Sequence, residues 1–317
     1  MSLFQQSAND EILGRGWVRQ IEWFNEIDST HTAARRSLQE NPACELPCLL
    51  VAQQQTAGCG RGGRRWWSPD GCLMLTLVLP SQALPEDSNL WSQLALVTGL
   101  AVARTVTTSL PNKSVQLKWP NDVYAHGKKL AGILIESATV RRTQLDAATT
   151  ACWLVGIGLN VNVDWSDAPR EVASKATCLS SLASRPLDVH VVLVELLDEL
   201  ERVLQSWRLG DTSWLSQWRD RCLLTGKVIH VRQPPSRIDW GLRRSLMLAD
   251  GLSFETSRAF SFSMQAKSWL GNSYPNDAKW NWDDGIDKCG TQSAKSAQSS
   301  NLTRMISVYR QGCRYRE

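Results

Sequence analysis

A glycine- and arginine-rich stretch between two apolar segments constrains the fold more than any other feature of this sequence. Residues 53–68 read Gln-Gln-Gln-Thr-Ala-Gly-Cys-Gly-Arg-Gly-Gly-Arg-Arg-Trp-Trp-Ser, whereas residues 48–52 and 72–79 are strongly apolar. Glycine lets the backbone approach a ligand closely, and arginine donates planar, charged hydrogen bonds to phosphate or carboxylate oxygens. The pattern predicts a loop between two strands that binds an anion. A solvated basic surface loop is the alternative that this stretch leaves open.

Ordering this loop carries an entropic cost of roughly 1–2 kcal/mol per residue. We therefore expect it to be mobile when empty and to close over a bound anion, with Trp66 or Trp67 as a lid. The loop lacks the Gly-Lys-Ser/Thr that ends a Walker A motif. It also precedes a strand rather than a helix, so it is not the dinucleotide-binding Gly-x-Gly-x-x-Gly motif.

Composition excludes several classes of protein. The 317 residues carry a net charge of only +4, with lysines and arginines spread along the chain, so a general nucleic-acid binder is not indicated. No signal peptide is evident and no apolar run approaches the roughly 20 residues of a membrane span, so we expect a cytoplasmic protein. The nine cysteines form no Cys-x-x-Cys pair, which predicts reduced thiols and no metal site made by the protein. Catalysis by Cys59 is disfavoured because no histidine lies near it in the sequence.

Hydrophobic periodicity predicts alternating strands and helices. We expect a helix after residue 30, a polar, hairpin-like connection over residues 137–150, and further helices at residues 91–110, 187–207 and 214–222. The expected strands are residues 17–27, 48–52, 72–79, 115–119, 129–136, 152–163 and 227–232.

Polar residues stand where two of these elements begin or end. The first turn of the helix after residue 30 would place Ser29, Thr30 and His31 beside free N–H groups, either as an ordinary cap or as a second anion site. Pro120 ends the strand of residues 115–119 and presents Asn121 and Asp122 at its end.

Small residues interrupt the two long strands. Gly132 follows Ala131 in residues 129–136, where another group is expected to approach closely, with Lys129 at the entrance. Gly156 and Gly158 lie inside a buried strand and either leave room for a flat ligand or mark a bulge.

In this order the motifs resemble those of the bacterial biotin protein ligases, the biotin–[acetyl-CoA-carboxylase] ligases. The matching blocks are residues 28–30, 55–66, 118–122, 129–136 and 156–160, and the resemblance covers about residues 15–232. It implies an α+β fold of the class II synthetase-like type, with a mixed β-sheet flanked by helices in a catalytic domain at 15–225. It also implies a small SH3-like β-barrel in the C-terminal region, 226–317. Residues 233–317 show little strand alternation, so an incomplete or divergent barrel, a disordered tail and a change of reading frame in the source gene are the alternatives for this region.

The resemblance implies a two-step ligase reaction. Biotin and ATP, with Mg²⁺ bridging the phosphates, give biotinyl-5′-AMP and pyrophosphate, and a lysine of the biotin carboxyl carrier protein of acetyl-CoA carboxylase then takes the biotinyl group. It is compatible with a homodimer and implies no membrane partner. The residues before Asp28 are too few for a helix-turn-helix domain, so we expect the non-regulatory type without DNA binding.

Roles carry over to the matching positions only as implications of the resemblance. Lys129 would neutralise charge on the carboxylate and α-phosphate, Arg61 would clamp the intermediate, and Asp122 would assist amine attack or orient cations. His31 and Cys59 depart from the family, which commonly has Asn and Arg there. The implied biotin contacts are Ser29, Thr30, His31, Gln55, Cys59, Gly60, Arg61, Lys129, Gly132, Gly156 and Gly158. The implied nucleotide contacts are Arg61, Arg64, Trp66, Lys118, Asn121 and Asn160.

Two other functions compete with this interpretation. A lipoate protein ligase shares the fold and the adenylation chemistry, but the glycine-arginine loop and the Lys-Trp-Pro-Asn-Asp block favour biotin. A nucleic-acid-binding module would use the basic loop to hold phosphates, and its binding would weaken steeply with salt and would not require biotin.

Overall fold

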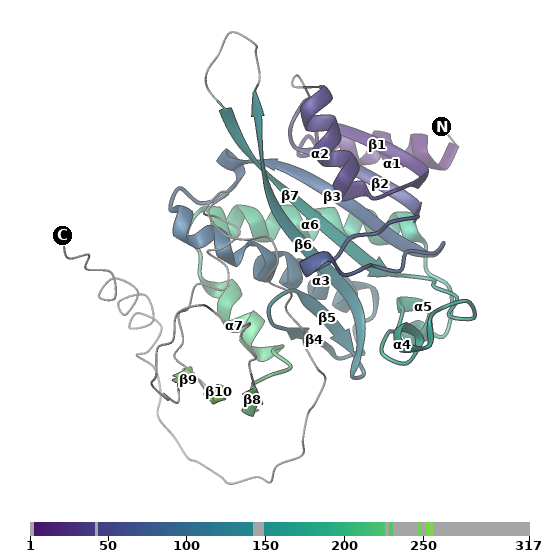
Figure 1. The fold of residues 1–317 in the computed structure, drawn as a ribbon, viewed down its shortest axis with the longest axis vertical. Coiled ribbons are helices and arrows are strands. Elements are labelled where there is room, and N and C mark those ends of the chain that lie inside the picture. Colours follow the sequence, from purple (N-terminus) through teal and green to yellow (C-terminus); the bar gives the residue numbers. More distant parts are fainter. Residues whose placement is uncertain are drawn as a thin grey trace, which may run out of the picture. The chain divides into compact units, whose positions relative to one another are not determined.

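The computed structural model describes residues 3–41, 44–141, 149–225, 228–230, 246–248 and 252–255. The described residues up to Leu223 belong to one compact unit and those after it to a second, and each unit is described by itself. The first unit is built on a seven-stranded sheet in the order β1-β2-β3-β7-β6-β5-β4 (Figure 1). β1 and β2 run parallel, and the other neighbours run antiparallel. The predicted mixed sheet flanked by helices is thus confirmed.

The strands and helices of this unit follow the chain in an alternating order. The strands are β1 (Gln20–Ile27), β2 (Cys48–Gln55), β3 (Cys72–Pro80), β4 (Val115–Lys118), β5 (Asp122–Ala125), β6 (Lys128–Arg141) and β7 (Thr149–Asn160). The helices are α1 (Leu3–Gly14), α2 (Thr30–Glu40), α3 (Leu94–Ser109), α4 (Arg170–Ala173), α5 (Leu179–Ala183), α6 (Val189–Arg208) and α7 (Ser213–Asp220). Three short 3₁₀ helices, η1 (Arg61–Gly63), η2 (Ser81–Ala83) and η3 (Ser88–Gln93), complete the unit.

Alternation along β3 explains why the sheet is covered on both faces. Leu75 and Leu77 belong to the core that contains α3 and α6, whereas Val78 belongs to a separate core with Ala34 and Leu38 of α2. Successive side chains of a strand point to opposite faces, so an unbroken apolar run indicates burial on both. Helices α3 and α6 lie together on one face (Figure 1), and α2 packs on the other.

The predicted hairpin-like connection over residues 137–150 does join two antiparallel strands, β6 and β7, but its bounds are wrong. β6 continues to Arg141 and β7 begins at Thr149, so both strands are longer than expected. Ala138 and Val140 pack in the core under α2, while Ser137 and Thr139 are exposed. This segment of β6 is a strand with one solvent-exposed face. The polar residues on that face led the sequence pattern to indicate a loop. Helices α1, α4 and α5 were not predicted either.

The second unit contains three short strands in the order β8-β10-β9, with β8 and β10 parallel and β10 and β9 antiparallel. They are β8 (Val228–His230), β9 (Leu246–Leu248) and β10 (Leu252–Glu255). β8 confirms a strand within residues 227–232. Apart from these three strands, the region of the predicted SH3-like barrel and tail, residues 226–317, lies outside the described residues. Within the described ranges, none of the helices has the length and apolar character needed to span a bilayer.

Leu100 tests the core between the sheet and its paired helices, because it lies in α3 and is 0 % exposed. Leu100→Ala should lower the free energy of unfolding by about 2–5 kcal/mol, since the cavity it leaves cannot fully collapse. Urea denaturation followed by circular dichroism measures this change. Leu209→Ala, at a residue that is 83 % exposed, is the control and should change it by less than about 0.5 kcal/mol. Equal effects of the two variants would contradict this packing.

Candidate functional site

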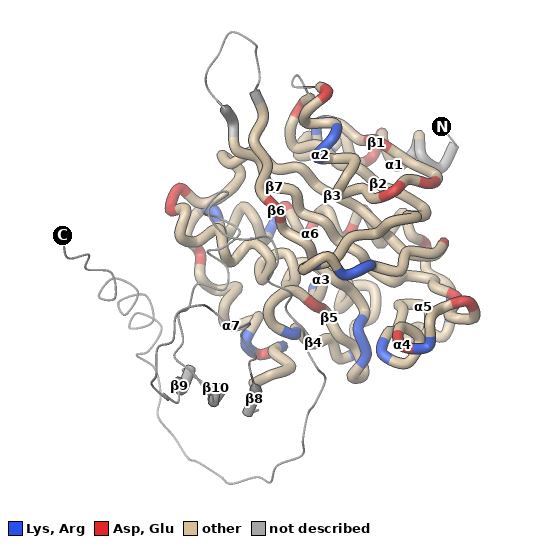
Figure 2. The backbone as a smooth tube through the Cα atoms, viewed as in Figure 1, with Lys and Arg blue, Asp and Glu red and all other residues tan. Residues whose placement is uncertain are grey.

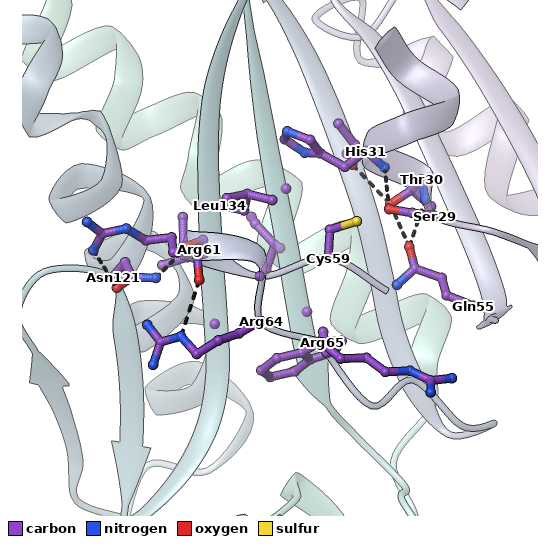
Figure 3. Close-up of a pocket in the computed structure, with 18 of the residues that line it drawn as sticks. Ser29, Thr30, His31, Gln55, Cys59, Arg61, Arg64, Arg65, Asn121 and Leu134 are labelled. Carbon is purple, nitrogen blue, oxygen red and sulfur yellow. Dashed lines mark hydrogen bonds between the residues drawn. The ribbon is translucent and has the colours of Figure 1, made fainter. Parts of the chain in front are cut away.

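A cavity of about 150 Å³ lies on the face of the sheet that carries α2 (Figure 3). Its walls come from the start of α2, the glycine-rich loop, the β4–β5 turn and the central strands β3, β7 and β6. In Figure 3, Ser29, Thr30, His31 and Gln55 lie at one end, and Arg61 and Asn121 lie at the other. The predicted residues that line it are Ser29, Thr30, His31, Gln55, Cys59, Gly60, Arg61, Arg64, Trp66, Asn121, Asp122, Lys129, Gly132, Gly156 and Gly158.

The start of α2 is fixed by hydrogen bonds to β2 and β3. The Ser29 hydroxyl caps the helix by accepting from the His31 N–H at 3.2 Å. Gln55 Oε1 accepts from the backbone N–H of Thr30 at 2.7 Å and from its hydroxyl at 3.2 Å, and the Thr76 hydroxyl donates to Thr30 at 3.0 Å. Ser29 is therefore an ordinary helix cap that also lines the cavity, and an anion site at this helix start stays a prediction.

The glycine-rich loop closes on itself as a tight hairpin. The Trp66 N–H donates to the Gly58 carbonyl at 2.9 Å, and the Gly60 N–H donates to the Arg64 carbonyl at 2.7 Å. At Gly58 a Cβ atom would lie 2.5 Å from the Trp66 carbonyl oxygen, so only glycine fits there. Gly62 has a φ of 65°, the left-handed conformation that lets the backbone turn back.

Asn121 fastens this loop to the sheet. Its Nδ2 donates to the Ile133 carbonyl of β6 at 2.7 Å, while its Oδ1 accepts from Arg61 Nη1 at 3.0 Å. Both ends of the amide are thus engaged within the protein. Asn121 therefore connects the loop to β6 and holds Arg61 over the cavity. We call its two hydrogen bonds, to Arg61 and to Ile133, the latch.

Arg61 is a half-buried cation whose hydrogen-bond partner here is a neutral amide. Burial lowers the pKa of its guanidinium, and the nearby Asp122 carboxylate opposes that effect. Arginine nevertheless stays charged in proteins, so the desolvated charge favours an anionic ligand.

Lys129, the second residue of β6, lines the cavity. Its Nζ lies 2.6 Å from Asp122 Oδ1, a charge pair with poor hydrogen-bond alignment, and 5.3 Å from the centre of the Trp66 ring. The ammonium is thus attracted both to a carboxylate and to an aromatic face.

Glycines form the floor of the cavity, and two aromatic rings of the protein cover it. β6 and β7 pair so that Gly132 stands opposite Gly158, and no bulge interrupts β7 at either of its glycines. A Cβ at Gly158 would lie 2.6 Å from the Trp66 ring, and one at Gly156 would lie 2.8 Å from Nδ1 of His31. The bulge alternative is therefore wrong, and the glycines make room for flat groups.

Positively charged side chains outnumber negatively charged ones around the cavity. Its lining contains four cationic side chains, Arg61, Arg64, Arg65 and Lys129, and one carboxylate, Asp122. The basic residues elsewhere fall on separate segments (Figure 2), so the concentration at this site is local. An anion bound among these groups would replace the water that charged side chains otherwise require.

Comparison with known proteins agrees with this geometry. Residues 23–160 match the model of the biotin/lipoate A/B protein ligase family. Over 248 residues the chain is 31 % identical to the biotin–[acetyl-CoA-carboxylase] ligase of Mycobacterium tuberculosis, an alignment that covers 77 % of this chain and 86 % of that protein. The chain belongs to the biotin protein ligase family.

Other relatives of this biotin protein ligase family member extend the comparison. The bifunctional ligase/repressor BirA of Bacillus subtilis is 33 % identical over 228 residues, which cover 70 % of this chain and 64 % of BirA. The biotin protein ligase of Aquifex aeolicus, solved with biotin and ATP, has a TM-score of 0.54 and 30 % identity, covering 66 % of this chain and 80 % of that one. The Leishmania major enzyme with biotinyl-5-AMP also has a TM-score of 0.54, at 26 % identity, covering 73 % of this chain and 91 % of that one.

Two residues of the predicted set lie away from the cavity. Lys118 lies over the ring of Tyr124, and Asn160 is buried, where its Nδ2 donates to the Thr177 carbonyl at 2.9 Å. The sequence interpretation named Arg65 among the loop arginines and included Ile133, Leu134 and Ile157 in its matched blocks without assigning any of them a contact, and it missed Thr76. Thr76, a polar residue in the apolar run of β3, was the clearest available signal. A second cavity of about 490 Å³, lined in part by Trp23, Asp70 and His190, contains none of the predicted residues.

The latch predicts how the loop responds to mutation. Asn121→Ala removes the bonds to Arg61 and to Ile133, each worth about 0.5–1.5 kcal/mol, so the loop should open about 10-fold more often. Limited trypsin digestion measures this as faster cleavage after the exposed Arg64 and Arg65. Asn89→Ala, at a residue exposed on η3, should leave the cleavage rate unchanged. Equal rates in wild type and Asn121→Ala would show that Asn121 does not hold the loop.

Proposed function

We propose that this protein is an ATP-dependent biotin protein ligase, which forms biotinyl-5′-AMP and transfers the biotinyl group to a lysine of a carrier protein. The observation that carries the proposal is the excess of positive over negative side chains around the cavity, above a flat floor of glycines. Such a site suits a flat, weakly polar head joined to a carboxylate that becomes a mixed anhydride with phosphate. Membership of the biotin protein ligase family supports the same reaction.

In the first step, a carboxylate oxygen of biotin attacks the α-phosphorus of ATP. The bond from that phosphorus to the bridging oxygen of the β-phosphate breaks, and pyrophosphate leaves with the electron pair. Negative charge builds on the oxygens around the phosphorus, where Lys129 and Arg61 offer fixed positive charge from the sheet and the loop. Charge placed before the reaction stabilises the transition state without reorganisation.

In the second step, the neutral amine of the carrier lysine attacks the acyl carbon and AMP leaves. Asp122 lies beside Lys129 at the cavity wall, where it can orient a cationic group or accept a proton from the attacking amine. Because Asp122 is paired with Lys129, both side chains lie at the same point of the cavity wall. Lys129 can therefore act on the phosphate in the first step, and Asp122 can act on the attacking amine in the second.

The loop gives the site a means of excluding water. Ligand pockets usually span roughly 300–1,000 Å³, whereas this cavity measures about 150 Å³ with Trp66 seated on the floor. A ligand on the glycines must therefore displace the Trp66 ring, which can then close over it. Closure protects a mixed anhydride from hydrolysis.

The residues at the cavity also fit a magnesium ion carried mainly by phosphate. Mg²⁺ usually takes one or two carboxylates together with substrate phosphates and water, and Asp122 is the carboxylate that lines the cavity. In the described part of the chain no three His, Cys, Asp or Glu side chains gather as a metal site. When bound with ATP, Mg²⁺ would neutralise phosphate charge and favour departure of pyrophosphate.

Biotin is the favoured acid over lipoate. The Aquifex aeolicus structure that this chain resembles contains biotin and ATP, and the Leishmania major structure contains biotinyl-5-AMP. The curated relatives described above are ligases of biotin or a biotin ligase/repressor. The name of the mycobacterial relative makes the carrier domain of acetyl-CoA carboxylase the proposed acceptor.

Lys129 should be essential for the first step. Lys129→Ala should lower the rate of biotin-dependent pyrophosphate release on the order of 10²–10³-fold, because the variant lacks a cation where phosphate charge develops. The assay compares biotin, lipoate and no acid with ATP and Mg²⁺. Lys128→Ala, at the exposed neighbour on the same strand, should retain near-normal activity. Pyrophosphate release that requires lipoate, or no acid at all, would overturn the proposal.

Magnesium removal should stop adenylation but not biotin binding. EDTA in excess should abolish pyrophosphate release, and added Mg²⁺ should restore it, because the ion acts on the phosphates of ATP. Biotin affinity, measured by isothermal titration calorimetry without ATP, should change by less than about twofold. A matching loss of biotin affinity in EDTA would mean that the metal is part of the biotin site.

A further inference from the structure

Cys59 combines exposure with a place on the cavity wall. Of the described cysteines five are buried and Cys222 is half-buried, whereas Cys59 is exposed. Its Sγ donates to the Ala57 carbonyl at 3.4 Å and lies 4.0 Å from the Thr32 hydroxyl oxygen. These contacts hold the thiol between the glycine-rich loop and the first turn of α2, at the cavity that it helps to line. A thiol in this place is accessible to a bound ligand.

Cys59 lies near the middle of the cavity. In Figure 3 it lies between Gln55 at one end and Arg61 at the other. Along the chain it precedes Arg61 by two residues, and it pairs with Arg65 in an isolated bridge that closes the hairpin. In biotinyl-5′-AMP the acyl carbon lies between the bicyclic head and the phosphate. A ligand with its phosphate at Lys129 and Arg61, and its head toward the other end, therefore brings its acyl carbon to the part of the cavity where the thiol lies.

An independent observation indicates that this cavity holds a polar ligand. His31 is 6 % exposed, and its Nδ1 lies at the cavity without a hydrogen-bond partner in the described part of the chain. A buried polar atom without a partner is unfavourable, and a ligand that supplies the partner removes that cost. Four cationic side chains on the same lining favour an anionic group. Cys59 therefore lies at a site suited to a ligand and not on an ordinary surface.

We propose that Cys59 takes the biotinyl group from biotinyl-5′-AMP and holds it as a thioester, an acyl-transfer activity beyond transfer to the carrier lysine. This rests on the proposed function, which supplies the adenylate. The sulfur of the Cys59 thiolate attacks the acyl carbon, and a carbon–sulfur bond forms. The bond from that carbon to the phosphate oxygen breaks, AMP leaves with the electron pair, and the thiol proton passes to water.

The site already contains what this step requires. The leaving group is the phosphate that the proposed function places at Lys129 and Arg61, so the charge that develops on it is stabilised at once. A free thiol is partly ionised at neutral pH and is strongly nucleophilic, so it reacts with an activated acyl group without a dedicated base. A neighbouring histidine, which the sequence around Cys59 lacks, is therefore not required. The thioester stays activated towards amines, so a lysine can take the biotinyl group from it and restore the thiol.

The first test measures the intact mass of the full-length chain after incubation with ATP, Mg²⁺ and biotin and an acid quench. Wild type should gain one biotinyl group, and neutral hydroxylamine, which cleaves thioesters and leaves amides intact, should remove it. In Cys59→Ser and Cys59→Ala the hydroxylamine-labile adduct per adenylate formed should be at least about tenfold lower. Cys222→Ser, at a half-buried cysteine outside the cavity, is the matched control and should retain the wild-type adduct. A labile adduct that persists without Cys59, or an adduct wholly resistant to hydroxylamine, would overturn the proposal.

A mixing experiment determines where the transfer takes place. Wild type is mixed with an equal amount of Lys129→Ala, which retains Cys59 but should form little adenylate, and the two chains are distinguished by their intact masses. Transfer within one cavity should label Lys129→Ala at least about tenfold less than wild type. Equal labelling of the two chains would show that adenylate free in solution acylates Cys59, and would overturn transfer within the site.

The outcomes also separate this inference from the proposed function. Biotin-dependent pyrophosphate release without a hydroxylamine-labile adduct would overturn the role of Cys59 alone. If wild type releases no pyrophosphate with biotin, synthetic biotinyl-5′-AMP, supplied in an amount equal to the protein, replaces the first step. Acylation of Cys59 by the supplied adenylate would then support the role of the thiol and overturn the first step alone, whereas no acylation would overturn both proposals.

Discussion

The pairing of β6 with β7 is the constraint on which the site depends. Gly132 stands opposite Gly158, and Gly156 stands between Leu134 and Thr76 on the neighbouring strands. Because side chains alternate along a strand, these glycines leave one bare strip on the face that carries α2. Each other part of the site is placed against that strip: the start of α2 at one end, the β4–β5 turn at the other, and the glycine-rich loop above it. A larger residue at Gly158 would meet the Trp66 ring and push the loop away.

Charge then determines what the strip can hold. Lys129 has one carboxylate partner, and Arg61 is held by the amide of Asn121, so positive charge over the floor exceeds negative charge. Desolvated cations without matching anions are costly, and a bound carboxylate or phosphate reduces that cost. Anion binding and loop closure are therefore coupled, because the same arginine takes part in both. Anion binding and loop closure share one coupling free energy. A variant that weakens the Arg61–Asn121 hydrogen bond should therefore also weaken binding of the anion.

The sequence predicted the parts of the site that lie within short motifs, and missed those that depend on register. Residues 53–68 and Asn121-Asp122 were identified because glycine, arginine and a strand end have local signatures. Glu136 and Thr76 acquire their partners only when β6 and β3 are aligned with α2 and β7, which no local pattern specifies. The extension of β6 was missed for a related reason, since Ser137 and Thr139 are polar on a face that is simply exposed. Lys118 and Asn160 belong to matched motifs, yet their positions in the fold direct them to Tyr124 and Thr177.

The two steps of the proposed reaction place opposite demands on the glycine-rich loop. The adenylate must be shielded from water, whereas the carrier lysine must reach the acyl carbon. The contacts that hold the tip of the loop over the floor include the Arg61 bond to Asn121 and the Trp66 ring, which lies against Gly158 with the Lys129 ammonium 5.3 Å from its centre. Together such contacts are worth a few kcal/mol, which leaves an open state at roughly 0.1–10 % of the population. A loop held this weakly can shield the intermediate for most of the time and still open for a docked carrier. Stronger fastening, for example an ion pair in place of the Arg61–Asn121 bond, would protect the adenylate at the expense of transfer.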